Sequence, residues 1–496
     1  MTKTIMVQGT MSSAGKSLLT AGLCRIFHQD GLRTAPFKSQ NMALNSFITA
    51  DGLEMGRAQV VQAEAAGIAP DVRMNPVLLK PCSDRGSQVI VRGEAIGTMD
   101  AVTYYDYRAG MKQVVLDSFQ SLAAEYDVIV IEGAGSPAEI NLNEDDIVNM
   151  GMAEMADAPV ILAADIDRGG VFAQIYGTIM LLPPEQRQRI KGVVINKFRG
   201  DVDILRPGLS MIEELTGVPV IGVVPYLPVD IDDEDSLSEH QSGGVKPIDI
   251  AVIQFPRISN ATDFTPLARM DSIRLRYVRK PTDLGRPDLI ILPGTKSTMP
   301  DLLWMRQNGL EALVKKAADH GTPLLGVCGG YQMLGQTLAD PDETELGGTL
   351  QGMGLLPVNT VFHPQKTRLQ STGCVCDLAG PYETLSGAAL NGYQIHMGQT
   401  TRLDGAMPFT RLSDGTLDGA VRGNVCGTYL HGLFDGPLAE RLTAMLLQRK
   451  GITPEESQNA ILSAAEFHQT QYDILADALR SNLDMEAIYA ILEKRR

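Results

Sequence analysis

Cysteine, histidine and tryptophan are all scarce in this chain. The 496 residues include 6 cysteines, 7 histidines and 1 tryptophan, and no two cysteines have the Cys-x-x-Cys spacing of zinc and redox motifs. So few thiols exclude a disulfide-stabilised secreted scaffold and favour a reducing compartment. The pair Cys374 and Cys376 is open to two interpretations, half of a metal site or two thiols on one face of a strand. The second is favoured, because no His or Cys cluster lies nearby in the sequence.

Positive charge and long apolar runs are lacking as well. The formal net charge is −16, which argues against nucleic acid and anionic membranes as main partners. No apolar run approaches the ~20 residues of a membrane span, and the first residues lack the pattern of a signal peptide. We therefore expect a soluble, cytoplasmic protein. Its length predicts two to four domains, and its apolar content of 44% is enough for sizeable cores.

The N-terminal stretch combines a strand pattern, a glycine-containing loop and a helix pattern. The apolar run 4–8 predicts a buried strand, and 17–29 predicts a helix with one apolar side. Gly-Lys-Ser at the start of such a helix is typical of a P-loop, in which backbone N–H groups and the helix N-terminus hold phosphate. Lys16 would reach the terminal phosphates, and the Ser17 hydroxyl would bind Mg²⁺. The predicted nucleotide-binding residues in this stretch are Gly9, Thr10, Gly15, Lys16 and Ser17.

Further apolar runs alternate with helical patterns, which indicates an α/β fold with a parallel sheet covered by helices. The carboxyl ends of such strands gather ligands. Glu132 ends one buried run and is our candidate for a Mg²⁺ ligand; the alternative is a carboxylate that caps the following turn. Asn196 ends another run and is a weak candidate for an adenine contact. The predicted strands are 128–131, 160–164, 192–196 and 218–224.

Two other stretches are rich in polar side chains. Asp165, Asp167 and Arg168 follow a strand and offer two carboxylates and a guanidinium, or else a solvated loop. Residues 37–46 and 74–81 are dense in amides, together with Lys38 and Lys80. This composition suggests a surface that reads amides and carboxylates by hydrogen bonds, although a plain solvated loop is equally compatible with it.

An acidic, glycine-containing boundary separates two halves of the chain. It carries the run Asp230-Ile-Asp-Asp-Glu-Asp235 and no hydrophobic period, so a linker is the simplest interpretation. We predict a P-loop synthetase domain over 1–228, a linker over 229–246 and a second parallel-sheet domain over 247–496. Amphipathic helices in its C-terminal part would serve packing or an interface. The strands predicted in this second domain are 250–254, 273–278, 289–292 and 324–327.

A nucleophile pattern lies in the second domain. Cys328 stands in Gly326-Val-Cys-Gly-Gly330, between a strand and a helix pattern, which is the context of a nucleophile elbow. The helix N-terminus would lower the pKa of the thiol. His431, at the end of another apolar run, is the candidate base, and His396 is its main rival. Backbone N–H groups of Gly329 and of the Gly294 region would stabilise an oxyanion.

A P-loop domain joined to a cysteine glutaminase resembles the cobyric acid synthase family over essentially the whole chain. The resemblance rests on the P-loop, on Tyr429-Leu-His431 and on five further blocks, one of which contains Cys328. Two departures stand out. Related glutaminases carry Glu two residues after the histidine, where this chain has Leu433, so a third triad member is absent or comes from elsewhere. The family pattern Gly-Tyr-Glu-Ile-His has Gln394 here. The further blocks are 37–46, 74–81, 132–136, 165–172 and 326–330.

The resemblance implies two parallel-sheet domains, dethiobiotin-synthetase-like and class I glutamine amidotransferase-like (flavodoxin-like). It implies amidation of the b, d, e and g carboxylates of adenosylcobyrinic acid a,c-diamide, with ATP, Mg²⁺ and glutamine. The alternatives are cobyrinic acid a,c-diamide synthase, a dethiobiotin-synthetase-like ligase without a glutaminase, and a MinD/ParA-like nucleotide switch. The oligomeric state stays open. The residues implied to bind the corrinoid are Lys38, Gln40, Asn41, Asn45, Asp165, Asp167 and Arg168.

Overall fold

The computed structural model describes residues 2–82, 86–142, 146–231, 246–453 and 464–493. It divides into two compact units. The first comprises Met1–Ala43, Glu54–Glu234 and Ala465–Arg496, and the second Leu44–Leu53 and Asp235–Ala464. Most of the predicted linker 229–246, including most of its acidic run, lies outside the described residues.

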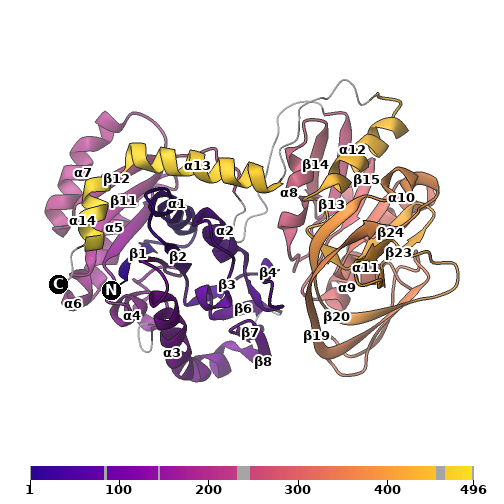
Figure 1. Ribbon diagram of the computed structural model, residues 1–496, viewed down its shortest axis with the longest axis horizontal. Helices are drawn as coiled ribbons and strands as arrows, with labels where there is room; N and C mark the ends of the chain where they lie inside the picture. The colour runs from indigo at the N-terminus through magenta and orange to yellow at the C-terminus, as the bar shows by residue number, and fades with distance from the viewer. Residues whose placement is uncertain (1, 83–85, 143–145, 232–245, 454–463, 494–496) are drawn as a thin grey trace. The chain divides into compact units, whose positions relative to one another are not determined.

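The first unit is built on a six-stranded parallel sheet in the order β12-β11-β10-β1-β9-β2 (Figure 1). Its central strands are fully buried, which explains their nearly continuous apolar runs. All the strands predicted from the first-half sequence are present, whereas β2 at the sheet edge was not predicted. The strands are β1 (Lys3–Gly9), β2 (Thr34–Phe37), β9 (Val128–Glu132), β10 (Val160–Asp165), β11 (Ile190–Phe198) and β12 (Val220–Pro225).

The polar stretch after the P-loop folds into more structure than a loop. It forms a four-stranded sheet of β3 (Gln40–Met42), β6 (Val77–Pro81), β7 (Gly86–Val91) and β8 (Glu94–Asp100). The short strand β5 (Glu54–Gly56) lies between β3 and β6 in the sequence and is not part of this sheet.

The helices of the first unit are α1 (Lys16–Gln29), α2 (Arg57–Ala65), α3 (Ala101–Ala123), α4 (Met150–Met155), α5 (Val171–Leu181), α6 (Pro184–Arg187), α7 (Val202–Thr216), α13 (Ala464–Asn482) and α14 (Met485–Glu493).

The C-terminal helices α13 and α14 belong to the first unit, and α13 lies along α1 (Figure 1). Leu475 and Leu479 face Gly22 of α1 so closely that a Cβ there would lie 2.2 Å from Leu479 Cδ1. Arg25 adds an ion pair of 2.8 Å with Asp473. The predicted second domain over 247–496 is therefore not contiguous in the structure. The apolar stripe of the C-terminal tail packs within the first unit.

The second unit contains another mainly parallel sheet, in the order β14-β13-β15-β16-β24-β23. Its predicted strands are present, and β23 is an antiparallel edge. The strands are β13 (Ile248–Ile253), β14 (Ile273–Val278), β15 (Leu289–Leu292), β16 (Leu324–Val327), β23 (Ala420–Arg422) and β24 (Val425–Thr428). The helices are α8 (Thr265–Arg269), α9 (Thr298–Gln307), α10 (Leu310–Asp319), α11 (Gly329–Met333) and α12 (Pro437–Arg449).

A second, largely antiparallel sheet of this unit was not predicted. It is dominated by the long pair β19 and β20, visible in orange in Figure 1. The strands are β17 (Thr337–Asp340), β18 (Gly348–Gln351), β19 (Val358–Val375), β20 (Ala389–Arg402), β21 (Thr410–Leu412), β22 (Leu417–Asp418) and β25 (Leu430–His431). The short strand β4 (Ser46–Ile48) also belongs to this unit.

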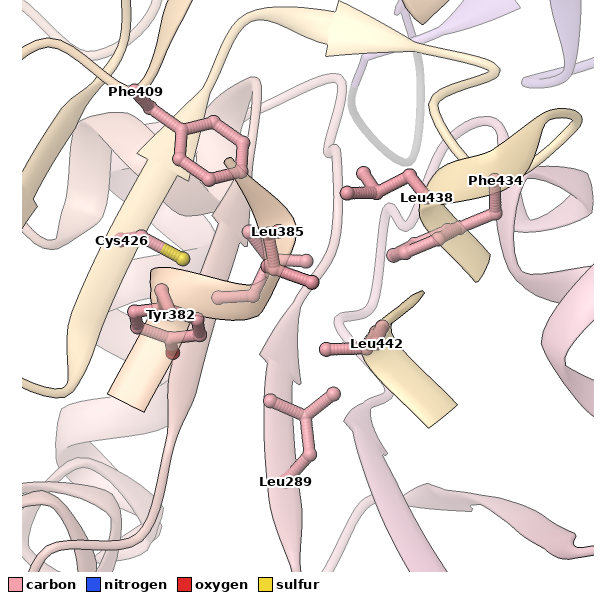
Figure 2. A pocket seen from close by; sticks show the side chains of 9 residues that line it. Leu289, Tyr382, Leu385, Phe409, Cys426, Phe434, Leu438 and Leu442 are labelled. Atoms are coloured by element: carbon pink, nitrogen blue, oxygen red, sulfur yellow. The ribbon is translucent and has the colours of Figure 1, made fainter. Parts of the chain in front are cut away.

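A small cavity of about 10 Å³ lies in the core of the second unit. Figure 2 shows apolar side chains converging on it, among them Leu289, Leu385 and Leu442. Such a volume holds one water molecule at most, and an apolar lining offers it few hydrogen bonds. The cavity is therefore a packing gap and no substrate site. No helix within the described ranges has the length and apolarity needed to cross a membrane.

Candidate active site

The P-loop lies between β1 and α1 and is held by a residue of β11, the second strand from β1 in the sheet. Gly15 caps α1 in the left-handed region, with φ 91°. A Cβ at Gly15 would lie 2.0 Å from Asn196 Nδ2, so glycine is required there both by conformation and by space. Asn196 donates to Ala14 O at 3.0 Å. Asn196, predicted to contact adenine, therefore holds the P-loop in this structure through this hydrogen bond.

The side chains of the predicted phosphate site converge on one point. Lys16 Nζ donates to Met11 O at 3.1 Å and to Gly135 O at 3.0 Å, so it folds back over the loop. Ser17 Oγ donates to Glu132 Oε1 at 2.8 Å. Thr10 N donates to Ala163 O at 2.9 Å. A Cβ at Gly9 would lie 3.1 Å from Lys16 Cγ. These residues come together at the carboxyl ends of β1, β9 and β10.

Glu132 is a buried carboxylate with three donors. Lys38 Nζ lies 3.0 Å and Gln62 Nε2 2.5 Å from its oxygens, besides Ser17. Burial would raise the pKa of Glu132, but the Lys38 charge and the hydrogen bonds hold it below its ordinary value. The group is therefore ionised. Ser17 and Glu132 offer the hard oxygen donors that Mg²⁺ prefers, so they fit the predicted ion. In the part of the chain that the structure describes, no three His, Cys, Asp or Glu residues are grouped as metal ligands.

The charged loop after β10 lies next to the same site. Asp165 Oδ2 is 3.0 Å from Lys197 Nζ and 3.8 Å from Arg168 Nε. Lys197 Nζ also donates to Ser13 O of the P-loop at 2.6 Å. Asp167 pairs with Arg199 at 3.2 Å. Two of the predicted carboxylates are thus neutralised by the unit's own cations.

The amide-rich block is divided between the two units. Gln40 Oε1 accepts from Tyr104 OH at 2.5 Å, and Asn41 Nδ2 donates to Gln59 Oε1 at 3.0 Å, both in the first unit. Asn45, predicted to contact the substrate with them, instead belongs to the second unit, where its Oδ1 accepts from Ala261 N at 3.3 Å. Asn45 thus makes a structural contact within the second unit, and its corrinoid role stays a prediction.

Cys328 sits on a sharp turn between β16 and α11. Its backbone has φ 50° and ψ −107°, a strained conformation for a residue with a side chain. The flanking glycines permit it. A Cβ at Gly330 would lie 1.9 Å from Leu292 O, and one at Gly326 would lie 2.7 Å from Tyr331 N. Cys328 Sγ lies 3.5 Å from Ile395 O. This is the geometry of a nucleophile elbow.

His431, on β25, is oriented by an acid that the sequence did not reveal. Its Nδ1 lies 2.6 Å from Asp263 Oδ2, and Gly432 N donates to Asp263 Oδ1 at 3.0 Å. His431 Nε2 is buried without a hydrogen bond of ordinary geometry to any described residue, and the interaction with Cys328 is among the causes that raise the pKa of the imidazole. Asp263, Cys328 and His431 thus have the relations of acid, nucleophile and base in a triad.

The electrostatics favour a charged His431 imidazolium paired with the Asp263 carboxylate. Burial lowers the pKa of His431, but the charge and hydrogen bond of Asp263, together with Cys328, raise it to about 10. The rival His396 is different. Burial lowers its pKa to about 4. Its Nδ1 and Nε2 lie 2.8 Å from Gly398 O and 3.3 Å from Gln394 Oε1. The geometry therefore favours His431 as the base.

The two predicted oxyanion segments lie beside the triad. A Cβ at Gly294 would lie 3.0 Å from His431 Cε1, and one at Gly329 would lie 3.2 Å from Thr295 N. The loops after β15 and β16 are therefore adjacent. Sequence reasoning missed three neighbours besides Asp263. Gln332 Oε1 accepts from Thr298 Oγ1 at 2.9 Å, and Tyr393 stacks on His431 with centroids 5.3 Å apart. Of these three neighbours, only Gln332 could have been found from the sequence, because it follows the Cys328 motif closely in the chain.

The comparisons with known proteins agree with this two-centre arrangement. Residues 5–245 match the CobQ/CobB/MinD/ParA nucleotide binding domain, and residues 249–439 match the CobB/CobQ-like glutamine amidotransferase domain. Cobyric acid synthase of Ruminiclostridium cellulolyticum is 56% identical over 100% of this chain and 98% of the relative. Those of Citrobacter koseri and Lachnoclostridium phytofermentans are 55% and 54% identical, over 100% of this chain and 99% and 100% of the relatives. The chain belongs to the cobyric acid synthase family, whose members carry out glutamine-dependent amidation in cobalamin biosynthesis.

Proposed function

We propose that this enzyme uses ATP and glutamine to amidate the b, d, e and g carboxylates of adenosylcobyrinic acid a,c-diamide and releases adenosylcobyric acid. The proposal rests on one observation above all: a P-loop with Lys16 and Ser17 and a Cys328–His431–Asp263 constellation occur in one chain. One centre can activate a carboxylate and the other can supply nitrogen. Full-length similarity to cobyric acid synthases supports the corrinoid as substrate.

The nitrogen is released at Cys328. The thiolate attacks the amide carbon of glutamine, and the N–H groups of Gly329 and the Gly294 region stabilise the oxyanion. The His431 imidazolium donates its proton to the departing nitrogen, so that ammonia leaves and a thioester remains. Neutral His431 then takes a proton from water, which hydrolyses the thioester to glutamate. Asp263 keeps Nδ1 protonated and Nε2 directed at the reacting atoms throughout.

The carboxylate is activated at the P-loop. A carboxylate oxygen is a poor leaving group, so transfer of the γ-phosphoryl group to it creates an acyl phosphate that ammonia attacks, with loss of phosphate. Lys16 and the loop N–H groups hold the phosphate oxygens. Ser17 and Glu132 would hold Mg²⁺, which would neutralise charge on the phosphates. For the corrinoid we propose contacts from Gln40, Asn41, Asp165, Asp167 and Arg168. Lys38 we propose instead as the ion-pair partner of Glu132.

Product analysis of the corrinoid by mass tests the proposal. The purified enzyme is incubated with adenosylcobyrinic acid a,c-diamide, ATP, Mg²⁺ and glutamine. Four hydroxyl-to-amide exchanges support it. Conversion of cobyrinic acid to its a,c-diamide, with no reaction of the diamide, would instead identify the sister enzyme. ATP hydrolysis with no corrinoid amidated would favour a nucleotide switch, and amidation from ammonia but never from glutamine would favour a ligase without a glutaminase.

A further inference from the structure

A short segment of the first half of the sequence belongs to the glutaminase unit. The chain leaves the nucleotide-binding unit after Ala43 and returns to it at Glu54. The residues between, Leu44–Leu53, include β4, which contacts β19 and β20 of the glutaminase unit. Neither of the two domain patterns in the sequence predicted this, because the segment lies inside the amide-rich block of the first domain.

One side of the segment holds the turn that carries the triad acid. Ser46 N donates to Asn260 Oδ1 at 3.0 Å, and Asn45 Oδ1 accepts from Ala261 N at 3.3 Å. Asn260 has φ 53°, in the left-handed region, and such a residue keeps that conformation only when its surroundings fix it. Asn260 O in turn accepts from Asp263 N at 3.0 Å. The segment thus fixes the turn from which Asp263 reaches His431.

The other side of the segment holds the ring that lies on His431. Tyr393 OH donates to Ser46 O at 3.0 Å, and the Tyr393 ring is stacked on the imidazole at an interplanar angle of 19°. Ile48 packs with Tyr393 and Ile395 in one buried cluster. The carbonyl of Ile395 is the oxygen that lies 3.5 Å from Cys328 Sγ. All three triad residues therefore have a direct neighbour that the segment contacts.

We propose that Asn45–Ile48 positions the glutaminase triad, so that this catalytic site is composite and incomplete without residues from the first half of the sequence. The inference rests on the proposed glutaminase activity. Asn45 and Ser46 fix the Asp263 turn, while Ser46 O and Ile48 fix the Tyr393 ring against His431. Because these groups do not touch the reacting atoms, they are positioning residues: their loss lowers the rate of glutamine hydrolysis through misalignment of His431.

The test uses full-length variants. Asn45→Ala removes the acceptor for Ala261 N, and Asn45→Asp keeps an acceptor oxygen there. Tyr393→Phe removes the hydroxyl that bonds Ser46 O and keeps the stacked ring. Asp51→Asn, at an exposed position of the same segment, is the control. For each variant, kcat and KM for glutamine hydrolysis are measured against pH, and corrinoid amidation is measured with ammonium chloride as nitrogen donor.

For Asn45→Ala and Tyr393→Phe we expect kcat for glutamine hydrolysis to fall about tenfold, the effect of one lost buried hydrogen bond. The alkaline fall of activity should move to lower pH, and ammonia-dependent amidation should keep its wild-type rate. Asn45→Asp should recover most of the loss. An Asn45→Ala variant with wild-type kcat and pH profile overturns the inference. So does one that raises KM for the corrinoid in the ammonia-dependent reaction, which would make Asn45 a substrate contact. A wild-type enzyme that never hydrolyses glutamine refutes the proposed function itself.

Discussion

Asp263 binds the imidazole of His431, which is 168 residues further along the sequence, with Oδ2 2.6 Å from Nδ1. Its second oxygen accepts from the backbone N–H of Gly432, the residue after the histidine. Both carboxylate oxygens thus hold the same short stretch of chain, which fixes the ring and its tautomer. The position of this acid explains how the site dispenses with a glutamate two residues after the histidine, where the chain has Leu433.

Replacing Asp263 by Asn should disable glutamine hydrolysis without disabling the synthetase centre. The amide favours the wrong imidazole tautomer and removes the charge that stabilises the imidazolium, so kcat for glutamine should fall on the order of 10²–10⁴-fold. Steady-state glutamate release measures it. The exposed Asp377→Asn serves as control. A kcat within a factor of about two of wild type would remove Asp263 from the triad.

The pH dependence of glutamine hydrolysis should report the His431 proton. Because the pKa of His431 is raised to about 10, the imidazolium persists through neutral pH and activity should fall only as the pH approaches 10. In Asp263→Asn the largest cause of the raised pKa is gone, so that fall should begin at lower pH. The same shift contributes stability that is full below about pH 6.5 and is lost as the pH rises through about 10. A wild-type alkaline limb centred near neutral pH would contradict the ion pair.

The buried pair of Lys38 and Glu132 should be visible in stability. Their side chains are 4% and 0% exposed, and removal of one partner leaves the other charged in a dry environment. Lys38→Met should therefore lower the free energy of unfolding by about 3–5 kcal/mol, and the double variant Lys38→Met with Glu132→Gln should recover part of that loss. Calorimetry of the two variants provides the comparison, and a loss in the double variant as large as in Lys38→Met would contradict the predicted recovery.

Acid unfolding gives a second reading of the same pair. The pKa of Glu132 is held below its ordinary value by Lys38 and hydrogen bonds, so it contributes stability that is present above the ordinary pKa and lost as the pH falls through the folded one. Without Lys38 the carboxyl takes up its proton at higher pH. Lys38→Met should accordingly begin to unfold at a higher pH than wild type.

The turn at Cys328 should not tolerate a methyl group. A Cβ at Gly330 would lie 1.9 Å from Leu292 O, so Gly330→Ala must displace either β15 or α11. We expect a loss of about 1–3 kcal/mol of stability and a glutaminase site that is open or misaligned. Gly436→Ala is the matched control, because its nearest neighbour would be 3.9 Å away. Thermal unfolding and glutaminase assays of both variants test this, and equal behaviour would argue against a tight elbow.

Much of the fold could be predicted because buried parallel strands are written as continuous apolar runs. β9, β10 and β16 are fully buried. Glu132, Asp165 and Cys328 lie at or directly after the ends of these strands, which is why the sequence indicated them as site residues. The β19–β20 pair escaped prediction because its residues alternate between buried and exposed without a continuous apolar run. The tail was correctly expected to be amphipathic. Its place on α1 depended on Gly22 and its neighbours, which carry no signal for a partner so distant in sequence.

The catalytic site was predictable only where a motif surrounds the residue. Cys328 has its flanking glycines and Lys16 has its loop. Asp263 lies in a short 3-10 helix, Ala261–Phe264, and no local sequence pattern distinguishes it from the other acidic residues of the chain. Asn45 was assigned to the corrinoid because it shares a block with Gln40 and Asn41. The block spans the point where the chain passes from one unit to the other, and no composition marks that crossing.

The most direct test of two cooperating centres is corrinoid amidation by wild type and by Cys328→Ala, each supplied with glutamine or with ammonium chloride. Products are resolved by mass, and ATP and Mg²⁺ are present throughout. The Cys328→Ala enzyme should lose all glutamine-dependent product and keep ammonia-dependent product at the wild-type rate, because only the nitrogen source is removed. Glutamine-dependent amidation by Cys328→Ala would contradict the assignment of the nucleophile, and loss of both reactions would contradict the separation of the two centres.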